Sequence, residues 1–173
     1  MIRPLVPDDA DDFYRLRGHA LKTDPEAFQT TLEEFQQTSR PEIEKRFRGT
    51  LADPKAFILG AFADDKMVGM MGLQQYSRSR IQHKGFIWGV YIAPDYRQRG
   101  LGGEILDFAL RMARGMAGLE QVQVTYVANN DAAGQLYQSR RFVQFGHEQA
   151  AMIVNKRPVD EIHAQLFLHQ SSN

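Results

Sequence analysis

The apolar residues of the first fifty positions recur mainly at helical spacing. A short apolar segment at 2–5 predicts a strand, and the residues after it predict a helix with one buried face. The apolar positions of that helix, three and four residues apart, are Phe13, Leu16, Ala20 and Leu21. Positions 24–52 are polar, helix-prone and interrupted by prolines, which indicates several short helices.

From position 56 onward the pattern alternates between strands and helices. Two apolar stretches, at 56–62 and 67–75, flank a four-residue turn and predict a hairpin. The other expected elements are a strand at 85–92, a helix at 101–116, a strand at 121–127, a short helix at 131–140, and strands at 142–145 and 162–168. This order predicts a mixed α/β fold, in which one crossover helix joins the third apolar strand to the next one.

The composition indicates one globular domain over 1–173 and excludes several functional classes. Lysine plus arginine equals aspartate plus glutamate, at 21 each, so a basic surface for nucleic acid is not expected. The chain has no cysteine, which excludes disulfides, thiolate metal sites and thiol nucleophiles. No apolar stretch approaches the roughly 20 residues of a membrane helix, and the acidic start does not resemble a secretory signal. We therefore expect a soluble cytoplasmic protein with no membrane partner.

Four aspartates follow the first expected strand and allow two interpretations. They are Asp8, Asp9, Asp11 and Asp12. Clustered carboxylates can bind a metal ion, but acids are also favoured in the first turn of a helix, where the dipole is positive. Pro7 marks such a helix start. We favour the helix interpretation and expect no metal site.

The segment 90–103, VYIAPDYRQRGLGG, combines a strand end, a turn and a glycine-rich loop that leads directly into an amphipathic helix. The first amides of a helix have no intrahelical partner, so they point toward any anion at its N-terminus. Glycines allow a phosphate to approach these amides, and arginines add positive charge. The residues in question are Arg97, Arg99, Gly100, Gly102 and Gly103. The loop lacks the lysine of a Walker motif and the third glycine of a dinucleotide fingerprint, so we predict a different phosphate site.

Two blocks of the sequence resemble the GNAT superfamily of N-acetyltransferases, specifically its bacterial single-domain members. The first is Arg97-x-x-Gly100-x-Gly102 after a strand, which is similar to the pyrophosphate loop of that superfamily. The second is the block Asn130-x-x-Ala133-x-x-Leu136-Tyr137, followed by Phe142. The resemblance extends from about position 56 to the C-terminus. It implies a mixed, mostly antiparallel sheet with flanking helices and a splayed, V-shaped cleft that binds acetyl-CoA as co-substrate.

The resemblance also implies which residues contact the cofactor. The main chain of Val90, Tyr91 and Ile92 would bind the pantetheine arm, and a bulge amide in this strand would polarise the thioester carbonyl. Asn130 would hydrogen-bond the arm from the other side. The pyrophosphate would lie against Arg97, Gln98, Arg99, Gly100, Leu101, Gly102 and Gly103.

Tyr137 is the expected catalytic residue. When an amine attacks the thioester, CoA leaves as a thiolate that needs a proton or a strong hydrogen bond, and a phenol can supply either. A purely structural interpretation, with Tyr137 packed beside Ala133 and Leu136, is compatible with that role because a buried tyrosine needs a partner for its hydroxyl.

The general base is not evident from the sequence. Many superfamily members carry a glutamate on the fourth strand or five residues before the asparagine, but Thr125 occupies that second position here, and the fourth strand reads Phe86, Ile87, Trp88 and Gly89. Three alternatives for the loss of the amine proton remain open: a water relay, a base supplied by Glu33, Glu34 or His83, and a substrate amine that is already neutral. Trp88, Tyr91 and Tyr126 lie on the strands that would flank the acceptor site. Arg141 replaces the glycine before Phe142, which implies a left-handed backbone or a different turn there.

Three functions follow from these observations. The first is an acetyl-CoA-dependent N-acetyltransferase that transfers acetyl directly to a primary amine of a small molecule or a protein. The second is a non-catalytic acyl-CoA sensor, which the missing carboxylate supports and Tyr137 opposes. The third, a nucleotide-binding module, is weakened by the absence of a Walker lysine. The identity of the acceptor stays open, and segments 24–52 and 76–84 would form its binding site. The oligomeric state also stays open, with a homodimer as one option.

Overall fold

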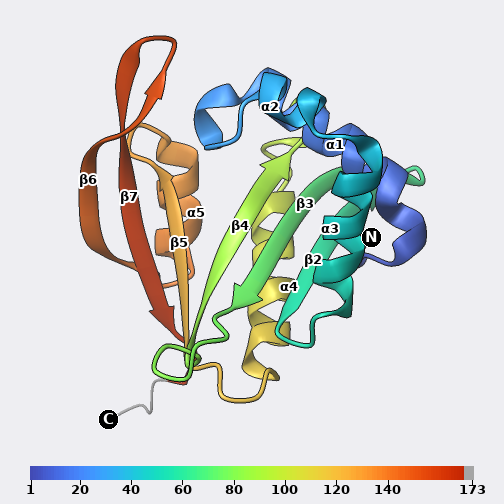
Figure 1. The fold of residues 1–173 in the computed structure, drawn as a ribbon. Helices are drawn as coiled ribbons and strands as arrows, with labels where there is room; N and C mark the ends of the chain where they lie inside the picture. Colours follow the sequence, from blue (N-terminus) through green and yellow to red (C-terminus); the bar gives the residue numbers. More distant parts are fainter. Residues whose placement is uncertain (170–173) are drawn as a thin grey trace.

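The computed structural model describes residues 1–169, which form one seven-stranded sheet in the order β1-β2-β3-β4-β5-β7-β6 (Figure 1). All neighbouring strands are antiparallel except β4 and β5. The strands are β1 (Ile2–Pro4), β2 (Ala56–Ala63), β3 (Lys66–Gln75), β4 (Lys84–Ile92), β5 (Gln121–Val127), β6 (Val143–Val154) and β7 (Arg157–Phe167). The predicted mixed α/β architecture is confirmed.

Helices cover both faces of this sheet, as Figure 1 shows. They are α1 (Ala10–Thr23), α2 (Leu32–Gln37), α3 (Arg40–Ala52), α4 (Leu101–Arg114) and α5 (Asp131–Ser139). Three short 3-10 turns, η1 (Pro7–Asp9), η2 (Pro25–Ala27) and η3 (Pro94–Tyr96), precede helices or connect them to strands. The α1–α3 group packs on one face, and α4 and α5 pack on the other. Within residues 1–169, no helix is long and apolar enough to span a membrane.

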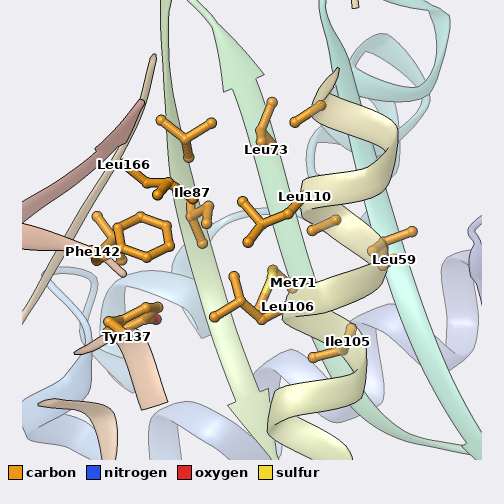
Figure 2. Close-up of a cluster of buried hydrophobic side chains, with 14 of the residues drawn as sticks. Leu59, Met71, Leu73, Ile87, Ile105, Leu106, Leu110, Tyr137, Phe142 and Leu166 are labelled. Carbon is orange, nitrogen blue, oxygen red and sulfur yellow. The ribbon is translucent and has the colours of Figure 1, made fainter. Parts of the chain in front are cut away.

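The two faces have separate hydrophobic cores. The larger core joins α4 and α5 to the sheet, with Ile105, Leu106 and Leu110 buried on α4 (Figure 2). The smaller one packs α1 and α3 against β2, β3 and β4, and includes Leu16, Phe47 and Tyr91. Strand residues alternate between the two cores, because successive side chains point to opposite faces of the sheet.

Strands β4 and β5 pair only at their first residues and then separate. Their parallel register covers Lys84–Phe86 against Gln121–Gln123. Farther along β4, Gly89 has a φ of +63°, and the pairing with β3 shifts register between Met70 and Gly72. A bulge of this kind bends the strand, and pairing with β3 continues on both sides of it, at Trp88 and at Tyr91. The expected V-shaped opening between β4 and β5 is confirmed.

The hairpin of β6 and β7 is much longer than the sequence pattern predicted. The pattern indicated strands at 142–145 and 162–168 only, whereas β6 runs from Val143 to Val154 and β7 from Arg157 to Phe167. Asn155 and Lys156 form the two-residue turn, with φ of 49° and 63°. Strand β6 is an edge strand with no buried residue, so no alternating apolar pattern marks it.

The four N-terminal aspartates are mostly held by arginines. The buried Asp9 pairs with Arg3 at 2.6 Å, and this hydrogen bond lowers the pKa of Asp9. Asp12 pairs with Arg15 at 2.9 Å, and Asp11 pairs with Arg40. These contacts give the acids a structural explanation. Of the two alternatives considered for Arg141, the structure shows the left-handed backbone, with a φ of +66°.

Candidate cofactor and acceptor cleft

The opening between β4 and β5 is a cleft of about 720 Å³. Its walls come from β4, the loop after it, the first turn of α4, β5 and α5, with η2 at one side. It is lined by Val90, Tyr91, Ile92, Arg97, Gln98, Gly100, Leu101, Gly102, Gly103, Asn130 and Tyr137. The fold therefore brings together the site residues expected from the sequence, with the exception of Arg99. The guanidinium of Arg99 lies over the Tyr96 ring, 5.5 Å from its centre.

The N-terminus of α4 opens into this cleft. Gly100 precedes the helix with a φ of +81°, a conformation that glycine adopts without strain, and no side chain in the described part of the chain caps the helix. The amides of Leu101, Gly102 and Gly103 therefore have no acceptor within residues 1–169. A helix end with free amides and a positive dipole attracts an anion such as a pyrophosphate.

Gly102 and Gly103 lack side chains for different reasons. A Cβ on Gly103 would collide with the guanidinium of Arg140, which pairs with Asp107 at 3.2 Å and ties α5 to α4. A Cβ on Gly102 would meet nothing closer than 3.8 Å, at Leu136. The protein itself thus leaves room for a side chain at Gly102, and that room faces the cleft.

Arg97 fixes the loop to the N-terminal helices. It donates from Nε to the carbonyl of Ile92 at 2.8 Å and pairs with Asp24 at 2.7 Å. Burial raises the pKa of Asp24, but hydrogen bonds from Arg97 and Thr23 together lower it by more, so the pKa lies below its usual value. With both contacts made, the charge of Arg97 is largely committed to positioning the loop.

Two other expected residues also have side chains engaged within the protein. The hydroxyl of Tyr91 lies 2.8 Å from His19 Nδ1 and 2.8 Å from Thr23 Oγ1, which leaves its main chain for a cofactor. The side-chain oxygen of Asn130 accepts a hydrogen bond from the amide of Ala133 at 3.0 Å and caps α5. The side-chain nitrogen of Asn130, Nδ2, donates no hydrogen bond within residues 1–169 and stays free for a ligand.

Tyr137 lies in the last turn of α5, beside Phe142 in the larger core (Figure 2). Its ring also packs on that of Tyr126. Only 3% of the residue is exposed, yet it lines the cleft, and its hydroxyl makes no hydrogen bond to residues 1–169. Burial, together with the neighbouring Tyr126, raises the pKa of Tyr137 well above the usual value. The phenol is therefore neutral near pH 7 and can donate a hydrogen bond.

The residues considered as general base lie in different places. Glu33 and Glu34 are on α2, where Glu34 caps the helix by accepting from the Thr31 amide at 2.8 Å. The carbonyl of His83 accepts from the Gln121 amide at 3.0 Å, which places His83 at the paired end of β4 and β5, away from their separation. Thr125 lines the cleft.

Beside Thr125 the structure places a histidine that the sequence did not indicate. This residue is His163 on β7, and its Nδ1 lies 3.1 Å from Oγ1 of Thr125. The other ring nitrogen of His163, Nε2, lies 3.0 Å from Glu148 on β6. Glu161 belongs to the same group, and burial raises the pKa of its carboxyl. The β5–β7 register brings Thr125 opposite His163, and no local motif encodes that pairing.

The aromatic residues considered for the acceptor site divide between the two faces. Trp88 lines both the cleft and a second cavity of about 200 Å³ under α1 and α3. Tyr126 packs with the larger core beside Tyr137. Arg17 of α1 lines the second cavity. The helical pattern of the sequence did not predict that Arg17 would lie in a cavity.

Within residues 1–169, the sheet opens at the parallel pair of β4 and β5, and the glycine-rich N-terminus of α4 lies in the opening. Solved structures of acetyltransferases share this fold. The model of the acetyltransferase (GNAT) family matches residues 14–142. This match covers most of the chain, which therefore belongs to the GNAT acetyltransferase family.

Individual relatives agree with this family. An uncharacterized N-acetyltransferase from Archaeoglobus fulgidus is 26% identical over 114 residues, which is 65% of this chain and 72% of that protein. A GNAT-family acetyltransferase from Streptococcus pneumoniae superimposes with a TM-score of 0.86 at 23% identity, covering 96% of this chain and 98% of the other. The putative acetyltransferase yncA from Salmonella typhimurium, solved with its cofactor acetyl-CoA, has a TM-score of 0.85 at 17% identity, covering 100% and 96%.

Proposed function

We propose that this single-domain chain is an acetyl-CoA-dependent N-acetyltransferase that transfers acetyl directly to a primary amine of a small molecule or a protein. The observation that carries the proposal is the placement of Tyr137. A neutral phenol without a hydrogen-bond partner within residues 1–169 lines the same cleft as the open amides of α4. An anion-binding helix end and a proton donor in one cleft fit a CoA thioester, which has a pyrophosphate and a thiolate leaving group.

The residues divide the reaction among them. The amides at the start of α4 would hold the pyrophosphate, and Asn130 and the main chain of β4 would hold the arm. The amine attacks the thioester carbon, so a C–N bond forms and the C–S bond breaks. Tyr137 donates its proton or a hydrogen bond to the departing thiolate. A main-chain amide at the Gly89 bulge would stabilise the oxyanion.

The proton lost by the amine has a path through Thr125. With His163 protonated on Nε2, that nitrogen donates to Glu148, and Nδ1 accepts from the Thr125 hydroxyl. The Thr125 oxygen can then accept the amine proton while its own proton moves to His163. The resulting imidazolium is stabilised by the carboxylate of Glu148. His163 does not touch the substrate in this scheme. It orients the Thr125 hydroxyl and receives the proton that the hydroxyl passes on.

Replacing His163 should slow the reaction without weakening cofactor binding. In His163→Gln, we expect kcat to fall by about 10²-fold, the lower end of the range for general base catalysis. The KM for acetyl-CoA should stay unchanged, because His163 acts only through Thr125. The measurement is CoA release with an accepted amine, for the wild type and the variant. His147→Gln, on the same hairpin, is the matched control. Equal kcat in wild type and His163→Gln would remove the relay.

Acetyl-CoA should stabilise the folded protein. At a ligand concentration 100 times the dissociation constant, the free energy of unfolding should rise by about 2.7 kcal/mol, since the ligand binds only the folded state. Chemical denaturation with and without acetyl-CoA measures this increase. A folded protein whose unfolding is insensitive to acetyl-CoA contradicts the proposed function.

A turnover screen separates the enzyme from a non-catalytic acyl-CoA sensor. Acetyl-CoA is incubated with a panel of primary amines, and free thiol is measured over time. Thiol release that depends on the amine identifies an acetyltransferase. Tight acetyl-CoA binding without turnover across small amines, peptides and proteins favours the sensor, which the lack of a carboxylate on β4 would then explain.

A further inference from the structure

Arg17 has a guanidinium without a hydrogen-bond or ion-pair partner among the described residues. Its Nη1 is buried and makes no hydrogen bond, and no carboxylate in residues 1–169 pairs with this side chain. Taking a guanidinium out of water costs free energy that a partner normally offsets. Burial accordingly lowers the pKa of Arg17. An unpaired buried charge of this kind indicates that a ligand brings the missing anion.

The position of Arg17 relates it to the reaction centre. Its guanidinium lies over the ring of Phe28, 4.5 Å from the ring centre, and its Nη1 would be 3.9 Å from a Cβ built on Gly89. Phe28 and Gly89 both line the cofactor cleft. Arg17 therefore reaches the β4 bulge from the α1 face, opposite the face on which α4 packs.

The cavity that Arg17 lines has a distinctive composition. Its volume of about 200 Å³ is roughly seven times the 30 Å³ that a water molecule occupies in the liquid. The lining contains four aromatic rings, three threonines, two isoleucines and two arginines, and no acidic side chain. The lining residues are Phe13, Arg17, Thr30, Phe35, Thr38, Ile43, Arg46, Phe47, Thr50, Ile58 and Trp88. Such a cavity suits a ligand with an apolar body and a negative charge.

The two arginines of the cavity are not equivalent. Arg46 pairs with Glu42 at 3.0 Å on the exposed surface of α3, so its charge is already compensated. Arg17 has no such partner in the described chain. Trp88 borders both this cavity and the cofactor cleft, so a molecule bound under α1 lies next to the bulge of β4.

We infer that the acceptor is an amine that also carries a carboxylate or a comparable anion, which Arg17 binds while the apolar body occupies the aromatic cavity. This inference rests on the proposed function. Because the guanidinium lies beside the bulge where the thioester carbonyl is expected, the anion and the amine must be separated by few bonds, as in an α-amino acid. Polycationic acceptors, such as polyamines, are disfavoured by the charge of Arg17.

The experiment compares amines that differ only in this charge. The probes are L-phenylalanine, L-leucine and L-methionine, each beside its carboxamide, which keeps the amine and the apolar body. For the wild type, we expect kcat/KM to be at least tenfold higher for each acid than for its carboxamide. CoA release is measured at one pH, and kcat/KM is expressed per concentration of neutral amine for both members of each pair. The same preference should appear when the probes bind the protein–CoA complex in calorimetry.

Variants then assign the preference to Arg17. Arg17→Gln should lose at least tenfold on the acids and little on the carboxamides, whereas Arg17→Lys should recover part of the loss. Arg48→Gln is the matched control, because Arg48 pairs with Glu44 on α3 outside the cavity. Arg17→Met is the second variant if Arg17→Gln does not fold. Unchanged acetyl-CoA affinity shows that each variant retains its cofactor cleft.

The outcomes distinguish this inference from the proposed function. If the wild type acetylates carboxamides as well as acids, the inference is overturned and the acetyltransferase function stands. If none of the acids binds the CoA complex, or if they bind wild type and Arg17→Gln equally, the inference is also overturned. If acetyl-CoA itself does not bind, the proposed function fails, and calorimetry of the acids alone decides whether Arg17 is an anion site.

Discussion

Gly102→Val should fold normally and lose most of its affinity for acetyl-CoA. A Cβ at this position meets nothing closer than 3.8 Å among the described residues, so the larger side chain occupies space that faces the cleft. It would keep the pyrophosphate from the first amides of α4. Each charge-assisted hydrogen bond lost costs about 1.5–3 kcal/mol, so the dissociation constant should rise by at least about tenfold. Calorimetric titration with acetyl-CoA measures the change.

Two comparisons isolate the cause of that loss. Gly49→Val makes the same chemical change on α3, where a Cβ has no neighbour within 4 Å, and acetyl-CoA affinity should be unchanged. Gly102→Ala adds a single methyl group and should give an intermediate dissociation constant. If Gly102→Val is folded and binds acetyl-CoA as tightly as the wild type, the N-terminus of α4 is not the pyrophosphate site.

The residues of the candidate cofactor side could be predicted to lie together because they are local in sequence. One continuous segment, 90–103, contains the end of β4, the loop and the first turn of α4. Its glycines and the amphipathic pattern after it mark a helix N-terminus whatever the rest of the chain does. The turn at 63–66 was equally local, and Asp64 and Asp65 adopt positive φ values there.

The proposed acceptor side could not be anticipated because it is assembled from distant strands and helices. His163 meets Thr125 only through the β5–β7 register, 38 positions apart in the chain. Arg17 occupies an ordinary position on an amphipathic helix, and its burial depends on how α1 packs over Phe28 and Gly89. Arg97 was expected at the pyrophosphate, but its pairing with Asp24 depends on the placement of η2 after α1. Side-chain partners of this kind follow from tertiary packing, which spacing does not encode.

The packing of Tyr137 determines which substitution tests its chemistry. Its ring lies 5.4 Å from that of Tyr126 and 5.5 Å from that of Phe142, within the larger core. Tyr137→Ala would remove these contacts and destabilise the protein by about 3–5 kcal/mol, so loss of activity would have two explanations. Tyr137→Phe keeps the ring and removes only the hydroxyl, which makes no hydrogen bond to residues 1–169.

Tyr137→Phe should therefore bind acetyl-CoA as the wild type does and turn over about 10²–10⁴-fold more slowly, the range for losing a general acid. The raised pKa of Tyr137 keeps the phenol protonated at neutral pH, so the wild type has a donor ready for the thiolate and the variant has none. A loss in kcat with unchanged cofactor affinity marks an interaction made only in the transition state. The measurements are calorimetric binding and CoA release with an accepted amine, with Tyr76→Phe, which packs on Phe86 away from the cleft, as the control. Turnover equal to the wild type would assign the thiolate to water or another group, and failure to fold would make Tyr137 a core residue only.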